Sequence, residues 1–342
     1  QTPIPAPPIE EPVDVEMPVD VEIEGEDISP QESPQGEFGD NLAESMAEGD
    51  LSSLATELIE LYDADVRSRS DWERAYIDGL DYLGMKVEER ADPWPGACGV
   101  FHPILTEAVV RFQSQAITEV FPSTGPARTK ILGKQDKEKV AIADRVGAEI
   151  NYILTEKMSE YRQETEQLLF RLPLVGSAFR KVYFDPIEQR PLAVMVPAED
   201  FVISYGSSDL KSSERYTHVM RRSRNELDKL MVTGFYTDLD LPDPTPTYSE
   251  TKKAEDSLSG IEPTIETDTR FQLLEMHCDY QFNNGDGDYA LPYIVTIEKT
   301  SAKVLSIRRN WLEDDQLKRK RIHFAHYQYM PGLGFYGFGL IH

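Results

Sequence analysis

The first pattern with chemical potential is a glycine-rich segment, Gly332–Gly337, with the spacing G-x-G-x-x-G. In a dinucleotide-binding site this pattern precedes a helix, and an acidic side chain follows about twenty residues later. The printed sequence ends at His342, before either feature, and Phe335 and Tyr336 would crowd a pyrophosphate. We therefore favour a flexible bend that joins two elements, with a nucleotide-binding enzyme as the less favoured alternative.

The six histidines show no catalytic or metal-binding arrangement. His102 has no Ser, Cys or carboxylate at a catalytic spacing, so a capping or packing role is favoured over that of a general base. His277 falls on the polar side of an expected strand. His323 and His326 fall on opposite faces of another, because side chains alternate along a strand. We expect no catalytic, cofactor-binding or metal-binding residue in this chain.

Two charged clusters complete the candidates for chemistry. The segment Asn284–Asp288 lacks the twelve-residue loop and terminal Glu of a calcium site, and a hairpin turn explains it. The second cluster is the concentrated basic patch of the sequence: Lys318, Arg319, Lys320 and Arg321. Its function is either to contact DNA phosphates or to be a charged strand end beside the acidic Glu313–Asp315. The sequence leaves both interpretations open.

Charge is distributed unevenly along the chain. Residues 1–50 contain fifteen acids, eight prolines, one aromatic residue and neither Lys nor Arg. Such a segment has too little apolar surface to offset the entropy of ordering, so we expect a disordered acidic tail. The chain has 61 acids and 35 bases, which leaves 61 − 15 = 46 acids and 35 bases after residue 50. This net charge of −11 does not suit a protein that binds DNA over a wide surface.

Cysteine usage and hydropathy exclude two further classes. Cys98 and Cys278 lie 180 residues apart and indicate neither a metal site nor a disulfide framework, which favours a reducing compartment. No apolar run approaches the roughly 18 residues needed to cross a bilayer, and no signal-peptide pattern opens the chain. We expect neither export nor membrane insertion.

Apolar periodicity predicts that residues 51–176 are largely helical. The inward-facing stripes expected in three of these helices are Leu51, Leu54, Leu58 and Leu61; Trp72, Tyr76, Leu80 and Leu83; and Ile142, Val146, Ile150 and Ile153. The polar stretch between the first two predicts a solvated middle or a break. A further helix from about Glu160 carries Leu168, Leu169 and Leu172 toward Pro173.

Residues 177–330 have the pattern of an antiparallel β-rich region. Short strands are expected at 179–184, 192–196 and 201–203, followed by a helix with the capping box Ser223–Glu226. Residues 241–268 predict a long mobile loop. A hairpin of alternating residues, 274–282 and 289–297, and a third strand, 303–309, come next. The expected fold class is α+β.

Residues 93–122 are the most informative segment of the chain: PWPGACGVFHPILTEAVVRFQSQAITEVFP. A rigid Pro-Trp-Pro-Gly turn leads into a helix with one broad apolar face, and the other face is polar without a nucleophile. This pattern is typical of a packing helix. The residues expected to pack in the core or against another subunit are Trp94, Leu105, Val109, Phe112 and Val120.

Together with LLFRLPLVGSAFRKVYFDP (168–186) and VPAEDFVISYG (196–206), this segment resembles the portal proteins of tailed bacteriophages, in a short-tailed-phage-like branch. The resemblance extends roughly from Leu54 to the last residue. It implies a head-to-tail connector, a typically dodecameric ring at the portal vertex of the virion capsid, assembled in the host cytoplasm. It also implies portal-wing folds for residues 51–330, without enzymatic activity.

The implied partners are further copies of the chain, the large terminase subunit, the major capsid and scaffolding proteins, a tail adaptor, and double-stranded DNA that passes through the channel during packaging and ejection. No cofactor and no membrane are implied. We expect an N-terminal fragment of a longer portal protein, with residues 331–342 approaching a missing stem and clip region. Another virion head-tail adaptor or structural protein is the main alternative.

Overall fold

The computed structural model describes residues 37–83, 94–96, 102–185, 188–244, 250–258, 270–282 and 289–342. Helices and antiparallel sheets build the chain together, so the expected α+β class is confirmed. Within these ranges no helix has the length and apolar character required to span a membrane. Residues 1–36 of the predicted tail lie outside the described residues, as does the turn 283–288.

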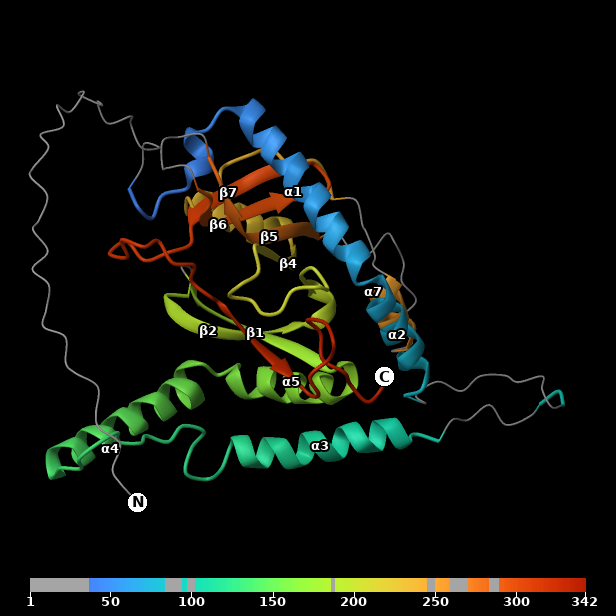
Figure 1. The fold of residues 1–342 in the computed structure, drawn as a ribbon, viewed down its shortest axis with the longest axis vertical. Coiled ribbons are helices and arrows are strands. Elements are labelled where there is room, and N and C mark those ends of the chain that lie inside the picture. Colours follow the sequence, from blue (N-terminus) through green and yellow to red (C-terminus); the bar gives the residue numbers. More distant parts are fainter. Residues whose placement is uncertain are drawn as a thin grey trace, which may run out of the picture.

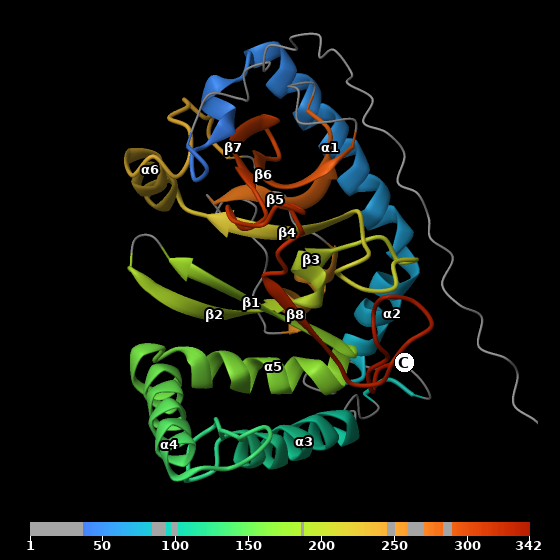
Figure 2. The same ribbon diagram turned by 60° about the vertical axis from the view of Figure 1, so that its left-hand side comes forward.

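Two antiparallel sheets form the centre of the fold (Figures 1 and 2). The first has the order β2-β1-β8, made of Ser177–Asp185 (β1), Arg190–Pro197 (β2) and Phe324–Gln328 (β8). The second has the order β3-β4-β5-β6-β7, made of Phe201–Val202, Arg215–Arg222, Phe271–Tyr280, Leu291–Glu298 and Lys303–Arg309. The predicted hairpin and third strand are thus confirmed as β5, β6 and β7. The predicted short strands correspond to β1, β2 and β3.

The polar face predicted for β5 is not a solvent face. Leu274, Met276 and Cys278 pack with helix α1 on one side, as alternation predicts. Glu275 and His277, on the other side, are also withdrawn from solvent. The three-stranded sheet covers them, and Lys181 of β1 binds Glu275 with an Nζ–Oε2 distance of 2.6 Å. This ion pair offsets part of the free-energy cost of removing the two charges from water.

Two consecutive helices, α1 (Glu48–Ser68) and α2 (Ser70–Asp81), run along one side of both sheets (Figure 1). Their predicted apolar stripes are largely buried, with Leu58 in the core beneath α1 and Tyr76 in the core beneath α2. The predicted break lies at Arg69, between the two helices. It is not solvated, because the Arg69 side chain is only 3% exposed.

The Arg69 guanidinium is satisfied by groups far away in the sequence. Its Nη1 donates hydrogen bonds to the carbonyl oxygens of Ala198 and Phe201 and to the Tyr336 hydroxyl, at 2.8–3.0 Å. Its Nη2 donates to the Glu199 carbonyl at 2.7 Å and pairs with Glu73 at 2.8 Å. The helix break is therefore a junction that joins α1 and α2 to the β3 region and to the last segment of the chain.

The structure corrects the boundary of the predicted tail. Residues 42–45 form a short 3-10 helix, η1 (Leu42–Ser45), and α1 already begins at Glu48. Leu42 and Ala43 are buried in the core beneath α1. The Asn41 amide group lies at the open edge of β7, where it donates to the Leu305 carbonyl (3.1 Å) and accepts from the Ile307 N–H (2.9 Å). Composition did not predict this segment, because residues 1–50 contain few apolar side chains. The few that are present here are enough to cover one edge of the sheet.

Asn41→Ala is expected to lower the free energy of unfolding by about 1–3 kcal/mol, because it leaves polar groups of β7 without partners in a buried position. The check is urea denaturation of the variant beside Asn225→Ala, which truncates an exposed asparagine on α6 (Arg224–Val232). Equal stabilities of the two variants would contradict the role given to Asn41.

The predicted loop 241–268 contains a helix, which corrects the sequence-based interpretation. Helix α7 (Glu250–Leu258) lies against α2 (Figure 1), and the Tyr76 hydroxyl donates to Glu255 at 2.5 Å. Segments 245–249 and 259–269 lie outside the described residues. The predicted capping box is confirmed: Ser223 and Glu226 cap α6 reciprocally.

Residues 331–342 do not form a flexible bend. Met330 pairs with Phe338 in an isolated bridge, and the segment folds back on the end of α5 (Tyr161–Val175), where the Leu340 N–H donates to the Pro173 carbonyl. A Cβ at Gly339 would lie 2.1 Å from the Leu174 oxygen. Glycine is needed here because two backbones pass in contact.

Candidate functional site

Helix α4 (Lys137–Tyr152) presents an apolar face that no other part of the described chain covers. Ile142, Val146 and Ile150 repeat every four residues and are 50%, 45% and 38% exposed. The prediction that this stripe faces inward is therefore wrong for the single chain. Periodicity correctly identified the helix, but its apolar face is directed away from the core.

The opposite side of α4 is held by the segment that precedes it. Asn151 bonds the backbone of Ala127 through both amide atoms, at 2.8 and 3.1 Å. Gly147, the one buried residue described in α4, lies against Thr129. A single π-helical turn, η2 (Ile153–Lys157), then leads back to α5. The exposed stripe is thus fixed in place by polar contacts on the other side of the helix.

Helix α3 (Ile104–Val120) lies beside α5, and α4 closes the same end of the molecule (Figure 2). Of the residues predicted to pack, Val109 is fully buried and Leu105 and Phe112 are partly buried. Phe112 meets the Tyr329 ring edge to face, with centroids 5.4 Å apart. Trp94, 64% exposed, and Val120 do not belong to the core. The core interpretation is therefore wrong for these two residues.

An exposed aliphatic stripe on α4 is a physical anomaly that calls for a partner. A helix of this length is marginal in water by itself, since most helical stability in proteins comes from packing of an apolar face. Scattered apolar side chains are ordinary on protein surfaces, whereas aligned ones mark interaction sites. Ile104 and Val110 of α3 are exposed as well, so the apolar surface is not confined to α4.

The basic run lies in the connection between β7 and β8. Arg319 pairs with Asp315 at 2.9 Å, and Lys320 pairs with Asp279 at 2.9 Å and also donates to the Ser213 carbonyl. Lys318 lies over the Trp311 ring, 5.7 Å from its centroid. Two of the four cations are thus engaged by carboxylates of the same chain, and Arg321 is exposed. Phosphate contact by this run remains a proposal.

The sequence was compared with known proteins. It matches no protein-family model and no curated protein sequence. Functional inference consequently depends on the residues and the geometry of the chain itself.

The glycine-rich segment does not present its backbone to a ligand. Phe335 and Tyr336 are buried in the core between the sheets, and the Trp72 and Tyr336 rings stack with centroids 4.6 Å apart. The Gly337 N–H, which a phosphate-binding loop would direct to its ligand, donates instead to Ser177 Oγ at 2.7 Å. These contacts favour the structural interpretation of Gly332–Gly337.

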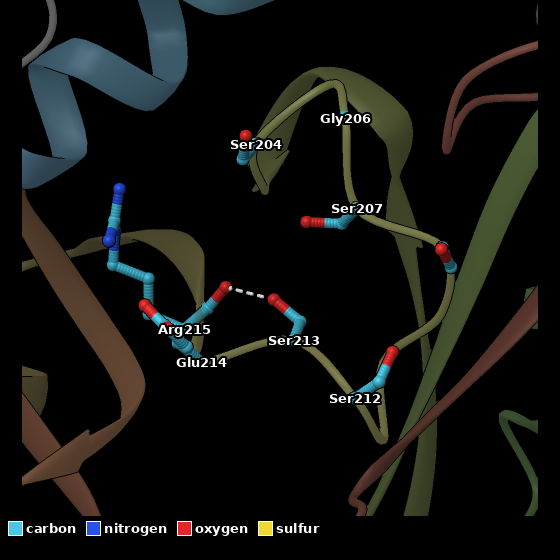
Figure 3. Close-up of a pocket in the computed structure, with 8 residues that line it drawn as sticks. Ser204, Gly206, Ser207, Ser212, Ser213, Glu214 and Arg215 are labelled. Carbon is cyan, nitrogen blue, oxygen red and sulfur yellow. Dashed lines mark hydrogen bonds between the residues drawn. The ribbon is translucent and has the colours of Figure 1, made fainter.

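A polar hollow of about 460 Å³ lies in the connection between β3 and β4 (Figure 3). Its lining is Ser204, Gly206, Ser207, Ser208, Ser212, Ser213, Glu214 and Arg215. Ser213 Oγ donates to the Arg215 carbonyl, and the Arg215 guanidinium is bound to Asp65. The described lining includes the carboxylate of Glu214 but neither a histidine nor a lysine, the bases that most often activate a serine hydroxyl.

Two of the histidines occupy packing positions. His326 stacks on the Phe179 and Phe335 rings, and burial lowers its pKa to about 4. His277 lies against the Tyr216 ring and bonds Glu275 at 3.0 Å. His102 is exposed directly before α3, so a packing role is wrong for it. Cys278 is buried, whereas Cys98 lies outside the described residues.

A carboxylate cluster at the α2–α7 contact was not predicted. Arg171 of α5 binds Glu199 of the 3-10 turn η3 (Ala198–Asp200) and, at 3.1 Å, Glu255 of α7. Burial, together with the nearby charge of Glu255, raises the pKa of Glu199 to about 7, although Arg171 opposes the rise. Two carboxylates therefore share one guanidinium, and the buried Glu199 is the one whose pKa is raised.

Glu199→Gln is expected to flatten the pH dependence of stability between about pH 4.5 and 7. Wild-type Glu199 keeps a proton in the folded state that it loses on unfolding, so stability falls as pH rises through this window, by up to about 3 kcal/mol. Urea denaturation at pH 5 and pH 8 tests this, with Glu166→Gln, a partly exposed glutamate of α5 that pairs with Arg162, as the control. The same pH dependence in both variants would contradict the assignment.

Proposed function

We propose that this chain is a subunit of a phage portal, the ring-shaped channel of the capsid through which DNA enters and leaves. The observation that carries the proposal is the uncovered stripe Ile142, Val146 and Ile150 on α4. An apolar face that its own chain leaves open, on a helix held in position by polar contacts, suits a contact with a neighbouring copy.

The ring requires a heterologous contact, in which one patch of a subunit meets a different patch of the next and the rotation closes. In this proposal the α4 stripe is one of the two patches. The charge balance also supports a conduit, since the part of the chain after residue 50, which is only mildly acidic, would not bind the phosphates of a moving duplex tightly. The implied partners are the large terminase subunit, capsid and scaffolding proteins, a tail adaptor and DNA, in the virion.

Sedimentation velocity of the purified protein tests the proposal. A subunit of this kind sediments as a discrete oligomer many times heavier than the 38.9 kDa chain at micromolar concentration. A monomer under all conditions of salt and concentration would contradict it. A nucleotide-dependent activity of the same preparation would favour the enzyme alternative instead.

A further inference from the structure

The space between the two sheets changes character from one end to the other. At one end it is filled by aromatic side chains, with the Phe179 and Phe201 rings stacked at 4.0 Å and Phe324 packed beside them. At the other end two adjoining cavities, of about 370 and 280 Å³, remain open. Both are lined by Lys181 and Tyr183 of β1 and by Met220 and Arg222 of β4. We call this space the inter-sheet cleft.

The larger cavity of the cleft is predominantly cationic. Its charged lining consists of Lys181, Arg221, Arg222, Arg270 and a single carboxylate, Asp200. Arg221 binds Asp200 at 3.1 Å, and Lys181 binds Glu275, which lines the smaller cavity. The ion pairs between described residues do not include Arg222. A guanidinium that forms no direct ion pair in a partly enclosed site keeps donors and charge available for an anion.

Neutral hydrogen-bonding groups surround Arg222. The Tyr183 hydroxyl interacts with it: burial raises the pKa of Tyr183, and the charge of Arg222 opposes the rise. His218 lines the same cavity, and burial, aided by the charge of Lys181, lowers its pKa to about 3, so the imidazole is neutral. Its Nδ1 is buried without a hydrogen-bond partner among the described residues. Buried polar atoms of this kind call for a ligand or a water.

We propose that the larger cavity of the inter-sheet cleft binds a phosphate-type oxyanion, free or as a monoester, with Arg222 as its principal contact and Lys181, Tyr183 and His218 around it. Guanidinium groups bind such anions through two parallel hydrogen bonds. The dimensions favour a small ligand, since a cavity of about 370 Å³ between two sheets does not admit a DNA duplex. This inference is independent of the proposed assembly function.

The carboxylates of the smaller cavity explain why the anion belongs in the larger one. Glu188 pairs with Arg190 at 2.6 Å, and Glu226 is engaged in the α6 capping box. Asp185 and Glu275 also line the smaller cavity. Lys181, Arg222 and Lys229 also line the smaller cavity, so its described charges nearly balance, whereas cations outnumber carboxylates in the described lining of the larger one.

Isothermal titration of the purified protein with inorganic phosphate, at an ionic strength held constant with chloride, tests the site. We expect saturable binding with one site per chain. Arg222→Gln is expected to weaken it about tenfold or more, because a charge-assisted contact is lost. The matched control is Arg74→Gln, which removes an exposed arginine of α2 and should change the affinity by less than about twofold.

Tyr183→Phe provides a second variant that removes only a hydroxyl group. If Arg222→Gln fails to melt cooperatively, a loss of affinity in Tyr183→Phe relative to the Arg74→Gln control supports the site. Dimethyl phosphate replaces inorganic phosphate in a further titration, and weaker binding is expected because a diester offers fewer acceptor oxygens and less charge. Absence of saturable phosphate binding, unchanged affinity in the cleft variants, or equal affinity for the diester would each overturn the proposal.

Discussion

Ile150→Asp on α4 is expected to abolish self-association while leaving the individual subunit folded. The side chain is exposed in the single chain, so the carboxylate stays in water and costs the monomer little. In a subunit contact the same carboxylate would be buried without a partner, which is expected to weaken association by about 3 kcal/mol or more, a factor of about a hundred. Thermal melts and sedimentation velocity of the same preparation measure both effects.

Val232→Asp is the matched control for this experiment. Val232 ends α6, is largely exposed, and lies on a different helix from the stripe. It receives the same charge at a site to which we assign no contact, so the oligomer should persist. An Ile150→Asp variant that assembles like the Val232→Asp control would show that the α4 stripe is not covered by another copy.

Arg69→Ala is expected to lower the free energy of unfolding by about 3–5 kcal/mol. The change removes the donors for three backbone carbonyls in a buried position and leaves Glu73 without its cation. Arg69→Lys should recover only part of this, because an ammonium group cannot reproduce the planar fork that serves several acceptors. Chemical denaturation of the variants measures the loss.

Arg74→Ala is the control, one helical turn along α2. Its side chain is 70% exposed and pairs with the exposed Asp71, a contact expected to contribute less than about 1 kcal/mol. Similar stabilities of the Arg69 and Arg74 variants would contradict the view that the junction between α1 and α2 anchors the distant segments of the chain.

Local signals predicted much of the fold. Apolar repeats located α1, α2, α3 and α5, and alternation located β5, β6 and β7, because in each case the pattern reflects burial by the chain itself. The same reasoning failed for the direction of the stripe on α4. A repeat shows that a face needs cover, but it does not show whether that cover comes from the same chain or from another.

Long-range pairing explains the other failures. The stretch around Arg69 is polar and so suggested solvent, yet its partners lie more than 120 residues away. Glu275 and His277 had the alternation of a solvent-facing strand side, and it is the three-stranded sheet, which supplies Lys181, that buries them. Distant partners of this kind leave no local signal in one sequence, so Arg222 and the inter-sheet cleft were also missed.

The apolar repeat predicted helix α4 and its stripe, but it did not predict that the stripe would be exposed to solvent. Trp94 and Val120 were correctly singled out as large apolar residues, and the structure places them outside the core. For the run Lys318–Arg321, composition left two interpretations, and two of its cations pair with carboxylates nearby.

Electron microscopy of the purified protein tests the central claim most directly, that this chain is a subunit of a portal ring. The account predicts closed rings with a central channel, in which α4 lies at the contact between neighbouring subunits. Particles of single-chain size, or oligomers without a channel in which α4 faces solvent, would contradict it.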